Sequence, residues 1–112
     1  MKKTILISAL LCIALSSTAF SQNPVKTRAN EWAKETGTVA GSASFCELDP
    51  KMLEIYINRS TNKIIETATD DTDIVVSKVE FSNYFNRSSV KEPKEGCDAF
   101  LRLFPKEMSR IN

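Results

Sequence analysis

Apolar residues recur at helical spacing along most of the chain beyond residue 22. The clearest stripe lies near the C-terminus and comprises six positions: Cys97, Phe100, Leu101, Phe104, Met108 and Ile111. Their spacing of i, i+3, i+4, i+7, i+11 and i+14 predicts one face of an α-helix. Pro105 lies within this stripe and has no amide hydrogen, so we expect a kink or a fresh turn there.

The longest predicted helix covers about residues 50–69. Asp49 followed by Pro50 is typical of an N-cap with proline at the first helical position. Beyond them, one face holds Leu53, Ile57, Ile64 and Ala68, with Met52 and Tyr56 beside it.

A first helix is predicted from the same signal at Asn23 and Pro24, with Gly37 as its stop. Between them Val25, Ala29, Trp32 and Ala33 form one apolar stripe. The following residues, 38–44, are small and polar. We favour a linker there; the alternative is that the helix continues, with its small residues packed closely against a neighbour.

A further helix is predicted after the acidic cluster at residues 69–73, whose side-chain oxygens can cap free amides at a positive helix end. Its apolar residues are Val75, Val79, Phe81 and Phe85. Residues 74–85 are also rich in β-branched and aromatic side chains, so a strand remains the alternative. Residues 88–96 contain Pro93, Gly96 and several charges, which predicts a loop.

The N-terminal segment has the order of a secretory signal peptide. Lys2 and Lys3 precede an apolar run of about eleven residues, 5–15, and residues 16–21 are small and polar. A membrane span needs about twenty apolar residues, so we expect cleavage rather than anchoring. Small residues at positions 19 and 21 favour cleavage after Ser21; cleavage after Ala19 is the alternative.

The chain therefore divides into a signal peptide, residues 1–21, and one small helical domain, residues 22–112. The short apolar run and the Met-Lys-Lys start look bacterial. We expect an exported protein of the periplasm or the extracellular medium.

Removal of the signal peptide takes Cys12 away and leaves Cys46 and Cys97. An even number of cysteines in an oxidising compartment predicts a disulfide. A bridge across 51 positions would contribute about 4 kcal/mol by loop-closure entropy, comparable to the whole stability of a small domain. It would join the start of the last helix to the start of the Asp49-capped helix. The predicted fold is thus all-α: a small bundle of about four short helices held by one disulfide.

The charge balance bears on possible partners. The signal holds two of the fifteen basic residues and none of the fourteen acids, so the mature chain has thirteen bases, fourteen acids and a formal charge of −1. A nucleic-acid binder normally has a basic excess, and we expect no nucleic-acid partner. No second apolar run reaches membrane length, so we also expect no stable membrane insertion of the mature chain.

The chain contains no histidine, which removes the usual Ser-His-Asp, Cys-His, zinc and copper sites. The acids at positions 70, 71 and 73 do not continue into a calcium loop, and helix capping is their expected role. We therefore expect no catalytic residues, no bound metal and no cofactor, and thus a non-enzymatic protein.

Most aromatic residues of so small a domain must lie in its core. Phe45 and Tyr84 are the two that we predict on the surface, as part of an interaction surface, because a thin bundle cannot cover every ring. The alternative is simple packing against the disulfide.

Small size, near-neutral charge and surplus aromatics favour a protein-interaction module of the envelope, an accessory, inhibitor or immunity-like protein, with another protein as partner. The alternative is a chaperone linked to acid or other stress. The layout, with two cysteines about fifty residues apart at predicted helix starts, resembles that of the periplasmic HdeA-type acid-stress chaperones, which implies an all-helical fold and many unfolded clients. A small-molecule binder is a third hypothesis.

Mass spectrometry of the exported protein tests both covalent predictions. We expect a chain that starts at Gln22 and is two hydrogens lighter than its reduced form. Mature protein that retains Met1 would contradict the signal peptide, and an unchanged mass on reduction would contradict the disulfide.

Overall fold

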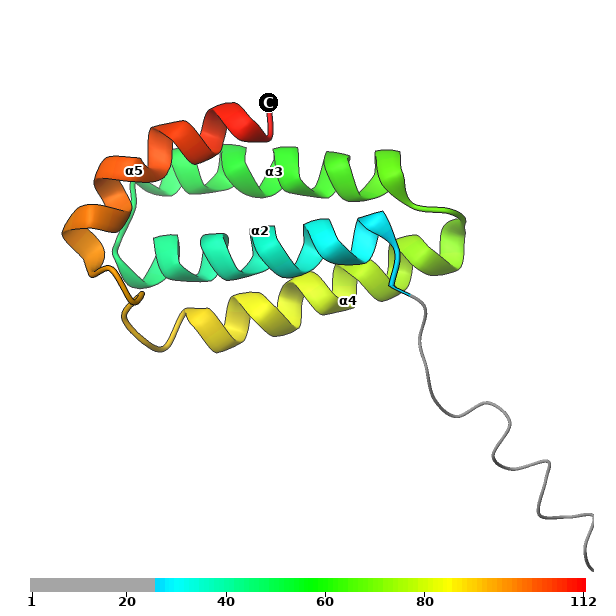
Figure 1. Ribbon diagram of the computed structural model, residues 1–112, viewed down its shortest axis with the longest axis horizontal. Coiled ribbons are helices and arrows are strands. Elements are labelled where there is room, and N and C mark those ends of the chain that lie inside the picture. Colours follow the sequence, from blue (N-terminus) through cyan, green and yellow to red (C-terminus); the bar gives the residue numbers. More distant parts are fainter. Residues whose placement is uncertain (1–25) are drawn as a thin grey trace, which may run out of the picture.

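The computed structural model describes residues 26–112, which form an all-helical bundle with one disulfide, as predicted (Figure 1). Within this part there is no strand, and the helices are α2 (Arg28–Phe45), α3 (Pro50–Thr67), α4 (Asp71–Ser88) and α5 (Cys97–Arg110). The expected signal peptide, Asn23, Pro24 and Val25 lie outside the described residues.

Helix α2 is the central element of the bundle. Figure 1 shows it between α3 and α4, with α5 folded back along α3. The chain therefore leaves α2 through a tight turn into α3, returns along the other side of α2 as α4, and crosses back to α3 as α5.

The start of α2 differs from the prediction. Residues 26 and 27 precede the helix, because the Thr27 hydroxyl accepts a hydrogen bond from the amide of Asn30 at 3.0 Å and so caps the first turn. Helix α2 therefore begins at Arg28, and the expected start at Pro24 lies outside the described residues.

The end of α2 also differs from the prediction, because the helix continues through residues 38–44 and the linker is wrong. Its end is a Schellman motif: the amide of Leu48 donates to the carbonyl of Ala43 at 2.9 Å, and Glu47 to Ser44 at 3.1 Å. Glu47 has φ 59°, the left-handed conformation that glycine usually occupies at this position. Gly37, where the sequence predicted the stop, lies in mid-helix.

The two glycines of α2 serve instead to bring α2 and α4 together. A methyl group on Gly37 would lie 2.6 Å from the backbone oxygen of Phe81, and one on Gly41 would overlap the backbone oxygen of Phe85. The backbones of the two helices thus touch, which only glycine allows. The alternative reading of residues 38–44, a helix packed closely through small residues, is the correct one.

The other helix starts agree with the sequence. Asp49 and Asp70 cap α3 and α4, accepting hydrogen bonds from the amides of Lys51 at 3.3 Å and Asp73 at 2.8 Å. Residues 74–85 belong to α4, so the strand alternative is excluded. Helix α3 is not the longest, because α2, α3 and α4 each have 18 residues.

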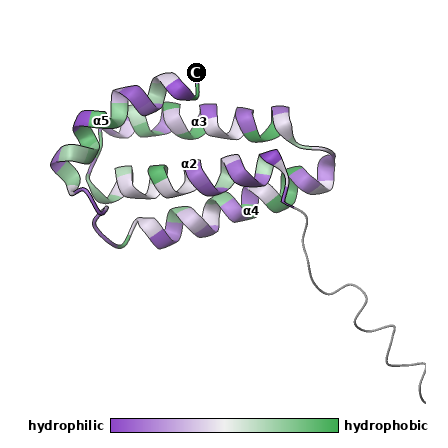
Figure 2. Ribbon diagram, in the orientation of Figure 1, coloured by the Kyte–Doolittle hydropathy of each residue, from purple (hydrophilic) through white to green (hydrophobic). Residues whose placement is uncertain are grey.

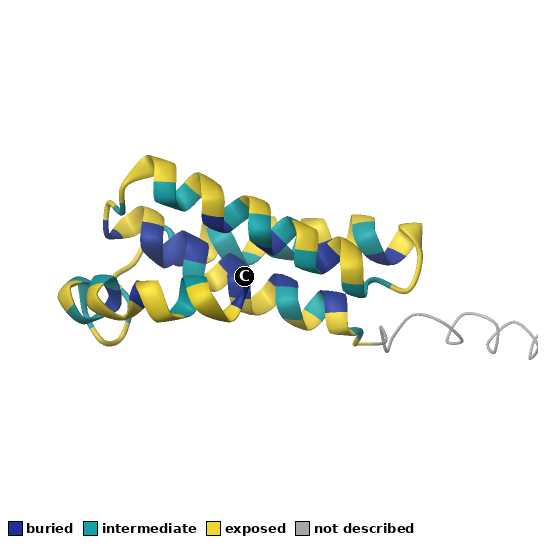
Figure 3. Ribbon diagram, turned by 90° about the horizontal axis from the view of Figure 1, so that it is seen from above, coloured by how far each residue is buried: buried dark blue, intermediate teal, exposed yellow. Residues whose placement is uncertain are grey.

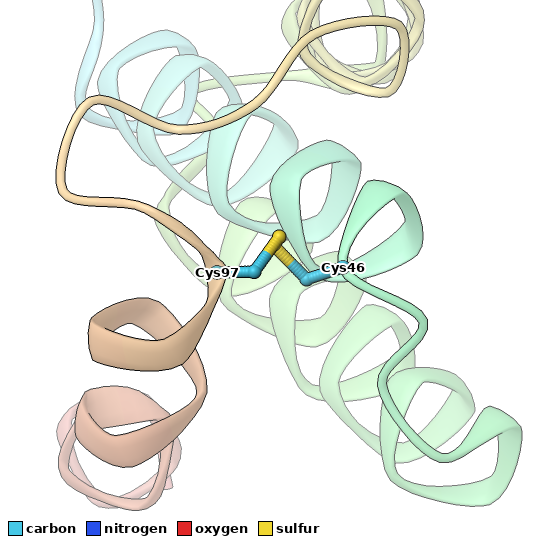
Figure 4. Close-up of a disulfide and its surroundings, with 2 residues drawn as sticks. All are labelled: Cys46 and Cys97. Atoms are coloured by element: carbon cyan, nitrogen blue, oxygen red, sulfur yellow. A yellow bond between two sulfur atoms is a disulfide. The ribbon is translucent and has the colours of Figure 1, made fainter.

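Helix α5 begins at Cys97 and continues past Pro105 to Arg110, so no fresh turn forms. The disulfide joins Cys97 to Cys46, with their Cα atoms 5.4 Å apart (Figure 4). Since Cys46 is also the C-cap of α2 and lies just before α3, the bridge fixes the start of α5 to the corner between α2 and α3.

The core is small and lies where the helices face one another (Figure 3). Its main cluster surrounds Tyr56, the α5 residues Phe100 and Phe104, and Ile111, the C-cap of α5. A second cluster joins Ile64 to Ala29 and Ala33. Hydrophobic and hydrophilic positions alternate along each helix (Figure 2), and several large apolar side chains stay exposed: Phe45, Ile55, Ile65, Val75, Val76, Val79, Val90 and Leu103.

Among residues 26–112, none of the helices combines the length and the apolar character that crossing a membrane requires.

The glycine contact between α2 and α4 yields the second prediction. Gly37→Ala and Gly41→Ala should each lower the free energy of unfolding by about 1–3 kcal/mol, because the new methyl group forces the helices apart. Helix propensity acts the other way, since alanine favours a helix over glycine by about 1 kcal/mol.

Urea unfolding followed by circular dichroism measures the change. Ser44→Ala, at an exposed position of the same helix, is the control and should stay within about 0.5 kcal/mol. A stabilised Gly41→Ala variant would show that the two backbones do not touch.

Candidate functional site

One side of α2 is left uncovered and forms the floor of a groove between α4 and α5. Helices α3 and α4 cover the alanine and glycine faces of α2, whereas Glu31, Lys34, Glu35 and Thr38 remain exposed. Three hollows of about 810, 510 and 590 Å³ lie along this side. They adjoin one another, because Val39 lines all three.

The apolar part of the groove lies beside α5. The hollow there is lined by four apolar residues, Val39, Phe100, Leu103 and Phe104, and by four charged ones, Glu95, Lys106, Glu107 and Arg110. Leu103 is 54% exposed and so presents apolar surface to this hollow. On the opposite wall, Tyr84 of α4 lines the other two hollows.

The wall formed by α5 is held by a polar cluster at its C-terminal half. The Tyr56 hydroxyl donates to Oε2 of Glu107 at 2.7 Å, and Arg110 donates to both Glu107 oxygens at 3.0 and 2.8 Å. The guanidinium of Arg110 also lies 3.4 Å from Glu35 and 5.1 Å from the ring centre of Trp32. Helix α5 is thereby fastened to both α3 and α2.

Tyr56 is fully buried. Burial, and then its hydrogen bond to Glu107, raises the pKa of the Tyr56 hydroxyl. The hydrogen bonds from Arg110 to Glu107 likewise raise the pKa of Arg110. These shifts stabilise the neutral tyrosine and the charged arginine, which are the forms that donate hydrogen bonds to Glu107.

The far end of the bundle is held by Asp73, a residue that the sequence assigned only to capping. One carboxylate oxygen accepts from the hydroxyls of Thr27, at 2.9 Å, and Ser77, at 3.3 Å. The other accepts from the amide of Thr69 at 2.9 Å. Asn30 of α2 in turn donates to Ser77 at 2.9 Å. Asp73 thus joins the start of α2 to the turn between α3 and α4.

These hydrogen bonds favour the ionised carboxylate of Asp73, which is only 8% exposed. The amide of Thr69 contributes most, and together the donors hold the pKa of Asp73 below its ordinary value.

The two predicted surface aromatics differ in their position relative to the groove. Phe45 is 39% exposed but lines none of the three hollows. Tyr84 is half-buried, and its ring has Lys34 at 5.7 Å and Arg87 at 4.8 Å from its centre. The fold therefore brings only Tyr84 into the groove.

Sequence reasoning missed Leu103 and the charged rim of the groove. The available signal was that Leu103 lies off the six-position stripe of its helix and so cannot face the core. The rim could not be found in this way, because its residues come from α4, α5 and the loop between them.

Within residues 26–112, no group of three or more cysteine, aspartate or glutamate side chains is placed to hold a metal ion. The side chains form an apolar groove with charged edges.

Comparison with known proteins adds no assignment: no family model, no curated protein and no solved structure matches this chain.

Asp73 yields the third prediction. Asp73→Asn should lower the free energy of unfolding by about 1–3 kcal/mol at pH 7, because the Thr69 amide loses a charged acceptor and faces an amide in its place. The contribution of Asp73 is fully present above its unfolded pKa of about 3.9 and is lost as the pH falls through the lower pKa of the folded state. The two proteins should therefore converge in stability below that range.

Urea unfolding from pH 7 down to pH 2.5 measures this convergence. Asp71→Asn removes the same charge from an exposed position two residues away and should cost less, within about 1 kcal/mol. A difference between Asp73→Asn and the unchanged protein that does not vary with pH would contradict the assignment.

Proposed function

We propose that the mature chain is an exported, non-enzymatic protein-interaction module of the cell envelope, of the accessory, inhibitor or immunity-like kind. The observation behind this proposal is the groove along α2, where Leu103 and Tyr84 offer apolar surface between two rigid helical walls. Exposed apolar surface of this kind, bordered by polar residues, is typical of a site that another protein covers.

The rigidity of the groove supports the same proposal. Its floor is fixed by the glycine contacts to α4. Its α5 wall is fixed at one end by the disulfide and at the other by the Tyr56, Glu107 and Arg110 cluster. A preformed surface binds with little loss of conformational entropy.

A second function is a chaperone that acts under acid conditions. It is favoured by Asp73, whose hydrogen bonds weaken on protonation and would release the end of the bundle at α2 and the α3–α4 turn. Val75, Val76 and Val79 are already exposed next to that end and would supply surface for unfolded clients. The disulfide lies at the opposite end and would keep the opened chain compact.

Site-specific photo-cross-linking in the producing cell separates the two functions. Leu103 is replaced by benzoylphenylalanine to probe the groove, and Val75 is replaced in the same way to probe the outer face of α4. An interaction module should give one defined cross-linked protein from position 103 at neutral pH, and none from position 75.

An acid chaperone should instead give many products from both positions, and only after a shift to low pH. No cross-linked protein from either position, at either pH, would contradict both functions.

A further inference from the structure

The groove along α2, taken as a whole, has dimensions that suit a helix. Its floor residues on α2 recur at Glu31, Glu35, Thr38 and Ser42, a spacing of i, i+4, i+7 and i+11. They span about three turns, or roughly 16 Å at 1.5 Å per residue. Floor and walls are themselves helices, and a helix lying in an apolar groove is a recurrent mode of protein recognition.

The apolar anchor near the disulfide is formed by three side chains from two helices. Val39 lies at the floor, and Phe100 and Leu103 lie on the α5 wall. An occupant would therefore turn apolar residues towards α5, at positions that repeat along one helical face.

The charges around the anchor are not balanced. The two hollows at this end are lined by five basic residues, Arg87, Lys91, Lys94, Lys106 and Arg110, and by three acids, Glu92, Glu95 and Glu107. Arg110 and Glu107 pair with each other. None of the other six takes part in an ion pair among residues 26–112, so four bases face two acids.

This excess is confined to the disulfide end. In the hollow nearest the start of α2, once Arg110 is counted with Glu107, two bases, Lys26 and Lys34, face three acids, Glu31, Glu35 and Glu80. The mature chain as a whole has one more acid than bases. The basic rim is therefore a local feature, which an acidic partner would complement.

We propose that the groove between α4 and α5, near the disulfide, binds an acidic amphipathic helix from another protein. Its apolar face would pack on Val39, Phe100 and Leu103, and its carboxylates would face Lys91, Lys94 and Lys106. This inference rests on the proposed interaction function and specifies the chemistry of the partner.

Fluorescence anisotropy with three labelled 16-residue synthetic peptides tests the proposal on the mature, disulfide-bonded chain. All three peptides place leucines on one helical face, and their remaining positions carry alanine together with glutamate, glutamine or lysine. The glutamate peptide should bind at least about tenfold more tightly than the lysine peptide, with the glutamine peptide between them. Added salt should reduce the difference, because exposed charges are screened.

Two variants assign this binding to the groove. The triple change Lys91→Glu, Lys94→Glu and Lys106→Glu should reverse the order of the glutamate and lysine peptides. Leu103→Ser should weaken all three peptides alike, because it removes an apolar anchor and leaves the charges unchanged. Neither variant changes a buried residue, and circular dichroism is used to check that each is folded.

The matched control reverses three charges outside the groove: Lys51→Glu, Lys78→Glu and Arg102→Glu. These residues are exposed and line none of the hollows. The control has the same net charge as the groove variant and should keep the original order of peptides. If it loses that order as well, net charge rather than the groove accounts for the preference, and the proposal is wrong.

The remaining outcomes also overturn the proposal. Equal affinities for the three peptides would exclude the charge preference, and no measurable binding would exclude the helix. Sedimentation that shows a dimer abolished by Leu103→Ser would make a second copy the occupant. If cross-linking at position 103 captures a defined protein that has no acidic amphipathic helix, the interaction function stands and this inference fails.

Discussion

The contact between the backbones of α2 and α4 at Gly37 and Gly41 is the constraint on which the rest of the bundle depends. With no side chain between them, the two helices lie closer than ordinary side-chain packing permits, and a methyl group on Gly37 would meet the Phe81 backbone oxygen at 2.6 Å. This brings Phe81 and Phe85 against the core and lets a thin layer of alanine and serine serve as its interior. The same contact turns the polar side of α2 outwards and leaves it without a covering helix.

The disulfide determines where α5 lies on the other side of α2. Because Cys46 ends α2 and Cys97 begins α5, the bridge starts α5 next to the core and directs it back along α3. Tyr56 and Arg110 then fasten its C-terminal half by way of Glu107. A domain this small gains much of its stability from such a link. In this fold the link also builds the second wall of the groove.

The groove and the Asp73 end differ in their dependence on pH. The wall of the groove is held at one end by a covalent bond, which does not titrate. At Asp73 the hydrogen bonds need an ionised carboxylate, and they are lost as the pH falls through its lowered pKa. A specific interaction at neutral pH and an opened state in strong acid are therefore compatible properties of one chain, located at opposite ends of the bundle.

The sequence by itself determined the all-helical class, the pairing of Cys46 with Cys97, and the starts of α3, α4 and α5, because capping side chains, proline and apolar periodicity act within a few residues. It did not determine where α2 ends, because glycine can either stop a helix or allow a neighbouring backbone to approach closely. The sequence does not distinguish these two uses. Glu47 ends the helix in a conformation usually taken by glycine, and no local sequence pattern predicts this ending. Of the candidate surface, Tyr84 was predicted, whereas Leu103 and the lysines at positions 91, 94 and 106 were not. These residues form one site only in the tertiary structure, because the groove lies between helices that are distant in sequence. The packing of the helices, and not the periodicity of each one, decides which helix faces stay uncovered.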